Sequence, residues 1–243
     1  MQYLLYLGRT LGCSRDKCRM AAQSISFFFR HVLKRSYVIP SVIYPRQSTR
    51  LPAVMSAMEM KTLIDSIKNV KHRTVVMLLY STGMRISEIS SLKIADIDGK
   101  NLRVKVVQGK GLKDRYTILS EQVLHELRVY YIMHRPVEYL FNGSKPGSRL
   151  SVRTIQHVVQ NALIRIGLGN KKYTVHTIRH SFATHLVDNG TDLHTVKELL
   201  GHNALQTTMR YLHLSTSRIQ GVVNPYDALP SDNDHQNGTS FNK

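Results

Sequence analysis

The stretch HTIRHSFATHLVDNGTDLHTVKELLGH, residues 176–202, has the pattern of two consecutive helices and decides the fold. Gly190 and Gly201 follow the two apolar-periodic segments, and glycine commonly ends a helix because it adopts the left-handed backbone conformation without strain. His176 and Arg179 lie three positions apart, so the first helix would project an imidazole and a guanidinium from one face. A pair of this kind also occurs by chance on the solvated helix face of a basic protein.

Outside this stretch the sequence predicts further helices and one β-hairpin. A capping box, Ser56 with Glu59, opens one of the helices. The hairpin would pair 102–106 with 116–119 across the glycine-flanked tip Gly109-Lys110-Gly111, and Tyr139–Phe141 is expected to add a third strand. The expected helices run over about residues 20–34, 56–67, 73–82, 120–134, 152–166, 176–188 and 192–200. The predicted fold class is therefore mainly α with a small antiparallel β-sheet (α+β).

The composition indicates a folded protein that binds a polyanion. The 243 residues carry 34 Lys and Arg against 16 Asp and Glu, a formal net charge of +18. This charge favours nucleic acid as the partner, with an anionic membrane second. A hydrophobic fraction of 42% with 21% charged residues excludes a disordered basic tail.

Cysteine use and hydropathy favour a cytoplasmic protein. Cys13 and Cys18 are the two cysteines. They can form neither a disulfide framework nor a complete zinc site, and we expect reduced thiols. The sequence has neither a secretory leader nor an apolar run long enough to span a bilayer, so no membrane association is expected.

Five separated segments of the chain resemble the catalytic boxes of one enzyme family. In addition to residues 176–202, they are LPAVMSAMEMKTLI at 51–64, TGMRISEISSLKIADID at 82–98, VVQGKGLKDRYTIL at 106–119 and TTMRYLHLS at 207–215. In order and spacing they resemble the tyrosine recombinase, or phage integrase, family, near its Xer-like and transposon-borne bacterial branch. The resemblance covers roughly Leu51 to Ser215.

The resemblance implies a DNA-cleavage site that surrounds the scissile phosphate. Its expected residues are Arg85, Lys110, His176, Arg179, His202 and the nucleophile Tyr211. Two guanidinium groups, Arg85 and Arg179, suit this role because they stay charged and pair bidentately with phosphate oxygens. They would also stabilise the negative charge that gathers in the transition state.

The other implied roles concern proton transfer. A phenol has an ordinary pKa of about 10, so Tyr211 must give up its proton, and His176 is the expected acceptor. His202 would hydrogen-bond a phosphate oxygen, and Lys110 would give a proton to the leaving 5′ oxygen. The product is a 3′-phosphotyrosyl enzyme that conserves the bond energy, so neither a metal, nor another cofactor, nor ATP is expected.

Some neighbouring residues have a second interpretation. His176 and His180 form H-x-x-x-H, but Thr177 stands where a zinc protease has its glutamate base, so a zinc site is not expected. His180 and His185 are expected to be packing groups or supports of the site.

Glu88, one turn from Arg85, either orients that guanidinium or makes a surface ion pair. Lys113 and Arg115 compete with Lys110 for the role of proton donor, but the glycines that flank Lys110 favour it.

The resemblance also implies a domain organisation and an assembly. The expected divisions are a partial helical core-binding domain (1–44), a linker (45–55), a catalytic domain (56–215) and a C-terminal tail (216–243). Relatives have a complete N-terminal domain that closes around DNA, whereas here it is expected to be shortened. The first fifty residues nevertheless hold nine basic residues and one acid, a net charge of +8 that favours phosphate contacts. Recombination is expected in a tetramer on two double-stranded DNA sites, with Ile219, Val222 and Val223 contacting a neighbour.

The sequence therefore predicts a site-specific recombinase of a mobile element that integrates, excises or inverts DNA, and that has no small-molecule substrate. It is expected in the cytoplasm, associated with the nucleoid. Two alternatives stay open at this point. One is a non-catalytic or truncated DNA-binding relative, and the other is a DNA-relaxing enzyme like the type IB topoisomerases.

Overall fold

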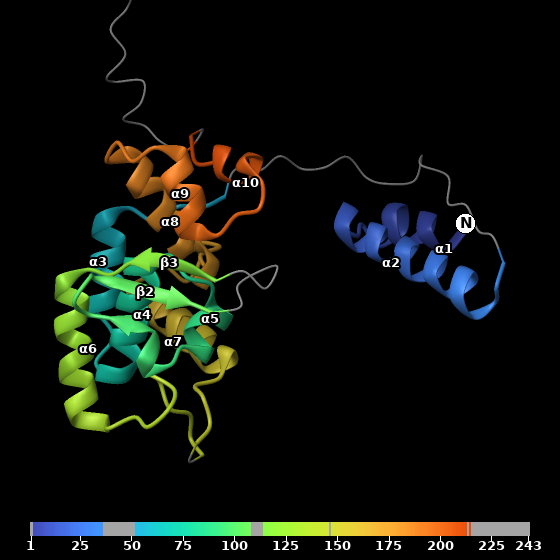
Figure 1. Cartoon of the computed structure of the whole chain (residues 1–243). Helices are drawn as coiled ribbons and strands as arrows, with labels where there is room; N and C mark the ends of the chain where they lie inside the picture. The colour runs from blue at the N-terminus through green and yellow to red at the C-terminus, as the bar shows by residue number, and fades with distance from the viewer. Residues whose placement is uncertain (1, 36–51, 108–113, 146, 213, 215–243) are drawn as a thin grey trace, which may run out of the picture. The chain divides into compact units, whose positions relative to one another are not determined.

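The computed structural model describes residues 2–35, 52–107, 114–145, 147–212 and 214. The chain divides into two units, residues 1–50 and 51–243, which Figure 1 draws in one view. None of the helices within the described ranges is both long enough and apolar enough to cross a membrane.

In the described part of the first unit, residues 2–35, the chain forms two helical segments. They are α1 (Gln2–Leu5), which continues into the π-helical turn η1 (Tyr6–Thr10), and α2 (Arg15–Phe27), which continues into the π-helical turn η2 (Phe28–Val32). The second segment begins earlier than the residue 20 expected from the sequence, because the Ser14 side chain accepts a hydrogen bond from the Lys17 backbone N–H (3.4 Å) and caps it there. A small core of Leu4, Leu7, Cys18 and Ala22 joins the two segments.

The second unit is mainly helical with a small sheet (Figure 1). Its helices are α3 (Ala57–Asp65), α4 (Val70–Thr82), α5 (Ile86–Ser91), the 3-10 turn η4 (Ile94–Asp96), α6 (Glu121–His134), α7 (Val152–Arg165), α8 (Val175–Asp188), α9 (Leu193–Leu200) and α10 (Leu205–Met209). Its strands are β1 (Ile97–Asp98), β2 (Arg103–Val106) and β3 (Arg115–Ile118). The predicted fold class is confirmed.

The three strands form an antiparallel sheet in the order β1-β2-β3. Val104 of β2 pairs with Ile97 on one side and with Thr117 on the other, so the predicted hairpin is confirmed. The predicted third strand, Tyr139–Phe141, is wrong, since Tyr139 makes only an isolated bridge with Lys93. The third strand is instead the two-residue β1, whose Ile97 and Asp98 pair with Val104 and Arg103 across a short turn. Two residues are too few to show a strand period in the sequence.

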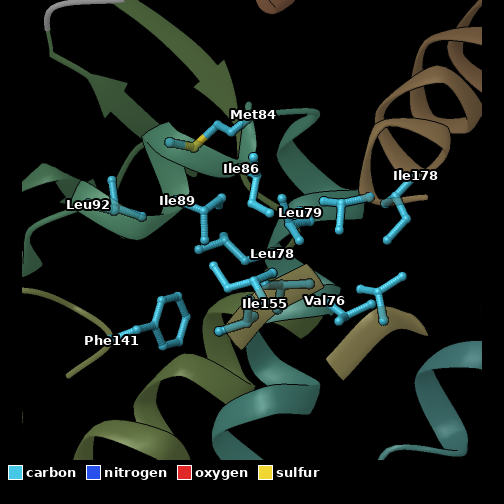
Figure 2. Packing of buried hydrophobic residues seen from close by; sticks show 14 of the residues in the cluster. Val76, Leu78, Leu79, Met84, Ile86, Ile89, Leu92, Phe141, Ile155 and Ile178 are labelled. Atoms are coloured by element: carbon cyan, nitrogen blue, oxygen red, sulfur yellow. The ribbon is translucent and has the colours of Figure 1, made fainter. Parts of the chain in front are cut away.

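The main core lies between the helices and one face of the sheet. Figure 2 shows buried side chains from α4, α5, α7 and α8 packed together, among them Leu79, Ile89, Ile155 and Ile178. A second, smaller cluster forms where α8, α9 and the residues after α10 meet, and it consists of Phe182, Ala183, Val187, Val196, Leu200 and Tyr211. Helix α9 also contacts β3, which brings the C-terminal helices against the sheet.

Candidate active site

Arg85 stands at the start of α5, where the preceding glycine fixes its position. Gly83 ends α4 with a φ of 59°, and a Cβ at this position would lie 2.2 Å from Phe182 Cδ1, so only glycine fits. The backbone N–H of Arg85 donates to Glu88 Oε2 and its Nη1 donates to Glu88 Oε1, both at 2.7 Å. The Glu88 side chain is 9% exposed, so it orients Arg85 from within the protein rather than from the surface.

Arg179 lies in the middle of α8 with only 7% of its surface exposed. Its Nη1 donates to Gly83 O (2.5 Å) and its Nη2 to Leu200 O (2.7 Å). Burial, followed by the charge of the neighbouring Arg85, lowers the pKa of Arg179 to about 10. The guanidinium therefore remains charged at neutral pH, and the protein holds it next to Arg85.

A third arginine completes this cluster. Arg115 of β3 binds the same carboxylate, with Nη1 to Glu88 Oε1 at 2.9 Å and Nη2 to Glu88 Oε2 at 2.8 Å. Burial by itself would raise the pKa of Glu88, but the hydrogen bonds and charges of Arg115 and Arg85 prevail and lower it to about 2. Three guanidinium groups and one carboxylate leave this cluster with a formal charge of +2, which suits a phosphodiester.

Tyr211 follows α10 and is almost completely buried, with 1% of its surface exposed. Its hydroxyl lies 3.0 Å from Nδ1 of His180, and its ring stacks on that of His202 with 6.3 Å between centroids and 15° between planes. Burial raises the pKa of the Tyr211 phenol, and the charge of Arg179 offsets part of this effect. The phenol is therefore protonated and held between two imidazoles.

Both imidazoles at Tyr211 are neutral. Burial, then the charge of Arg210, lowers the pKa of His180 to about 4, and burial, then the charge of Arg179, lowers that of His202 to about 3. Nδ1 of His202 also lies 2.9 Å from the hydroxyl oxygen of the buried Thr208. Both imidazoles are therefore unprotonated, as a general base must be before it acts, and their lowered pKa values make them weak proton acceptors in this buried state.

His176 occupies a different position from the one expected for the partner of the phenol. It is exposed at the start of α8, where it lines an open hollow with Arg153, Gln156 and His157 of α7. His180, which the sequence favoured as a packing or supporting group, is the histidine in contact with Tyr211. The signal that could have identified it is its place four residues after His176, because such residues share a helix face.

Lys110 lies outside the described residues, and its expected role stays a prediction. Arg115, the described alternative to Lys110, is fully engaged with Glu88 and with Leu199 O (3.1 Å from Nε). Among the residues that the structure describes, no group of three His, Cys, Asp or Glu side chains could hold a metal ion.

Comparisons with known proteins identify the family of the chain. Residues 53–218 match the model of the phage integrase family. Over 231 residues the chain is 35% identical to the putative integrase/recombinase y4qK of Sinorhizobium fredii, covering 94% of this chain and 74% of the relative. It is 33% identical to tyrosine recombinase XerD of Staphylococcus saprophyticus, with 88% and 77% covered.

A solved structure is similar as well. The XerH site-specific recombinase bound to its palindromic difH substrate, in a post-cleavage complex, superposes with a TM-score of 0.74 at 26% identity, covering 89% of this chain and 68% of that one. The family match and the relatives, together with a buried tyrosine beside a cluster of arginines, lead to one conclusion. The chain belongs to the phage integrase family of site-specific tyrosine recombinases.

Proposed function

We propose that this recombinase cuts and rejoins double-stranded DNA through a covalent bond between Tyr211 and a 3′ phosphate. The Tyr211 oxygen attacks the scissile phosphorus, the bond to the 5′ oxygen breaks, and a free 5′ hydroxyl leaves. Attack by the 5′ hydroxyl of a partner strand reverses these steps and releases the tyrosine. The observation that carries the proposal is the Tyr211 hydroxyl held 3.0 Å from His180 next to the arginine cluster.

Arg85 and Arg179 bind the non-bridging phosphate oxygens. A guanidinium has five N–H donors, and within the described residues Arg179 gives two of them to protein carbonyls, so further donors are available for the phosphate. Because the protein holds both side chains before DNA arrives, little reorganisation is needed in the transition state. His202, beside Tyr211, donates to one of the same oxygens.

The phenol proton passes to a histidine of α8. His180 is the acceptor favoured by its contact with the hydroxyl, and His176, on the same helix face, is the alternative. Replacing each histidine in turn with Asn distinguishes them. Loss of the true acceptor slows adduct formation, whereas loss of the other histidine does not. Lys110 gives a proton to the leaving 5′ oxygen.

Attack also requires a movement, because Tyr211 is 1% exposed. The phosphate reaches the phenol only when DNA binding shifts the residues that follow α9. Strand exchange then takes place in a tetramer on two DNA sites, in which Ile219, Val222 and Val223, which lie outside the described residues, contact a neighbouring subunit. The enzyme acts in the cytoplasm on the DNA of a mobile element, with neither metal nor ATP.

The similarity to XerD and y4qK favours recombination over the two alternatives, a non-catalytic DNA-binding relative and a DNA-relaxing enzyme. The test is an SDS-resistant adduct assay with nicked duplexes drawn from the DNA that flanks the gene. A nick beside the cut site lets the short leaving strand escape and traps the covalent state.

Wild type is expected to form the adduct on some fragments only, and Tyr211→Phe to bind the same fragments without forming it. Binding without any adduct would support the non-catalytic alternative. Equal cleavage of unrelated duplexes at matched salt would support the relaxing enzyme.

A further inference from the structure

Three consecutive carbonyl groups at the end of α9 each accept a hydrogen bond from a different arginine. The bonds run from Arg115 Nε to Leu199 O (3.1 Å), from Arg179 Nη2 to Leu200 O (2.7 Å) and from Arg85 Nη2 to Gly201 O (3.2 Å). The last carbonyls of a helix lack partners inside it and lie at the negative end of its dipole. The end of α9 thus stabilises three positive groups at once.

Arg115 is the one arginine of the three that does not face the phosphate in the proposed reaction. Both of its terminal nitrogens bind the Glu88 carboxylate, and its side chain is 11% exposed. The same carboxylate binds Arg85 through two hydrogen bonds. Arg115 therefore acts on Arg85 through Glu88.

The close approach of Arg115 to the end of α9 is a second, independent observation. Gly201 has a φ of 63°, and a Cβ there would lie 2.7 Å from Cδ of Arg115 and 2.9 Å from its Nε. The backbone of the turn that leads to His202 thus packs directly on this side chain. This contact joins Arg115 to the segment that leads to His202 and Tyr211.

We propose that Arg115 is a positioning residue for DNA cleavage, which holds Arg85 through Glu88 and fixes the turn before His202 and Tyr211. The proposal rests on the proposed function. Without Arg115, the Glu88 carboxylate would be opposed by Arg85 alone, and it would draw the guanidinium away from the phosphate. The formal charge of the cluster would fall from +2 to +1.

The first test measures cleavage and DNA binding separately for Arg115→Gln. Arg103→Gln is the matched control, because Arg103 lies on the adjacent strand and its Nε binds Asp98 at 2.8 Å, on a more exposed surface. With a nicked duplex that wild type cleaves, Arg115→Gln is expected to slow adduct formation about 100-fold, the effect of misplacing a catalytic group by about 1 Å. DNA affinity is expected to stay within a factor of about three, because Arg115 contacts no phosphate.

Two further variants identify the route of the effect. In Arg115→Lys, one ammonium cannot bind both carboxylate oxygens and the Leu199 carbonyl, so the rate should recover only in part. Glu88→Gln combined with Arg115→Gln should be no slower than the slower single variant, because both changes break the same link. Rate losses that multiply in full would overturn the link from Arg115 to Arg85 through Glu88, and a loss that follows DNA affinity alone would overturn the whole proposal.

A measurement that needs no activity completes the test. Hydrogen–deuterium exchange of the DNA-free protein should be faster at the amides of 201–212 in Arg115→Gln and unchanged there in Arg103→Gln. If wild type forms no adduct on any DNA, the proposed function fails, and exchange still tests whether Arg115 holds this segment. Unchanged exchange in Arg115→Gln, or faster exchange with cleavage at the wild-type rate, would overturn the positioning role.

Discussion

At the scale of single residues, the central feature of the site is the buried contact between the Tyr211 hydroxyl and His180. The hydroxyl is inaccessible to water, so Nδ1 of His180 is the partner that satisfies it. A buried polar group that loses its partner destabilises a protein by about 1–3 kcal/mol. The contact therefore links the resting position of the nucleophile to the stability of the fold.

The first prediction follows from this contact. His180→Leu leaves the phenol without a partner and is expected to lower the free energy of unfolding by about 1–3 kcal/mol. In a Tyr211→Phe background the same change should have a smaller effect, because no hydroxyl remains to be satisfied. Urea denaturation of the four proteins measures this coupling, and strictly additive losses would show that the hydrogen bond is absent.

The second prediction concerns pH. Burial lowers the pKa values of three histidines from the ordinary 6.5. The pKa falls to about 4 in His180 and to about 3 in His202, and that of His72 is lowered as well. Below pH 6.5 the unfolded chain therefore binds more protons than the folded one, so the free energy of unfolding should fall as the pH drops from about 6.5 to about 4.5. Above pH 7 the histidines should have no further effect.

Glu88 adds to this slope only near its acid end, because in the unfolded chain its carboxyl binds protons near the ordinary pKa of 4.5, whereas in the folded protein its pKa is about 2. Urea denaturation at several pH values measures the slope, and His180→Leu should reduce it. A stability that stays constant down to pH 4.5 would mean that these histidines are not buried in the neutral form.

At the scale of secondary-structure elements, the turn after α9 connects the arginine cluster with the nucleophile. Any other residue at position 201 would be strained, because φ there is 63°, and the absence of a side chain on Gly201 leaves room for Arg115. Gly190 follows α8 with a φ of 85°, and a Cβ at this position would meet no atom within 4 Å, so Gly190 shows the backbone effect alone.

The third prediction compares these two glycines. Gly190→Ala is expected to destabilise the protein by about 1–2 kcal/mol, the strain of a left-handed alanine. Gly201→Ala should cost more, because the added methyl group must displace Arg115, and it should also slow adduct formation. The measurements are thermal or urea denaturation and the adduct assay, and equal effects of the two variants would argue against the contact.

The elements also differ in how far the sequence could predict them. The boundary of α4 at Gly83, the capping box at Ser56 and the hairpin of β2 and β3 follow from local chemistry, and each is confirmed. The short β1 and α10 could not be predicted, because two to five residues are too few to show a periodicity.

The same limit applies to the site. The boxes around Arg85, Arg179 and Tyr211 predicted the family correctly, and the roles of the individual residues stay predictions. The contact of Tyr211 with His180 and the three arginines at the end of α9 depend on the packing of α8, α9 and β3. No one-dimensional spacing encodes that packing.

At the scale of the whole molecule, the net charge of +18 determines how the chain meets DNA. Each phosphate that a basic side chain neutralises releases counterions, so the logarithm of the affinity falls linearly with the logarithm of the salt concentration. The fourth prediction is a loss of affinity of about 10³-fold between 50 and 200 mM salt, which corresponds to about six phosphate contacts.

Fluorescence anisotropy with a labelled duplex measures this dependence. Arg115→Gln should keep the wild-type slope, because Arg115 binds Glu88 and Leu199 rather than DNA. An affinity that hardly changes with salt would mean that phosphate contacts contribute little to binding.

The identity of the covalently bound residue is the central claim, and peptide mapping of the trapped adduct tests it most directly. Wild-type protein is mixed with a nicked duplex that it cleaves, the complex is digested with protease and nuclease, and the nucleotide-bearing peptide is sequenced by mass spectrometry. The account predicts a phosphodiester bond on Tyr211 and no modified peptide from Tyr211→Phe. A nucleotide on any other residue, or an adduct that persists in Tyr211→Phe, would contradict it.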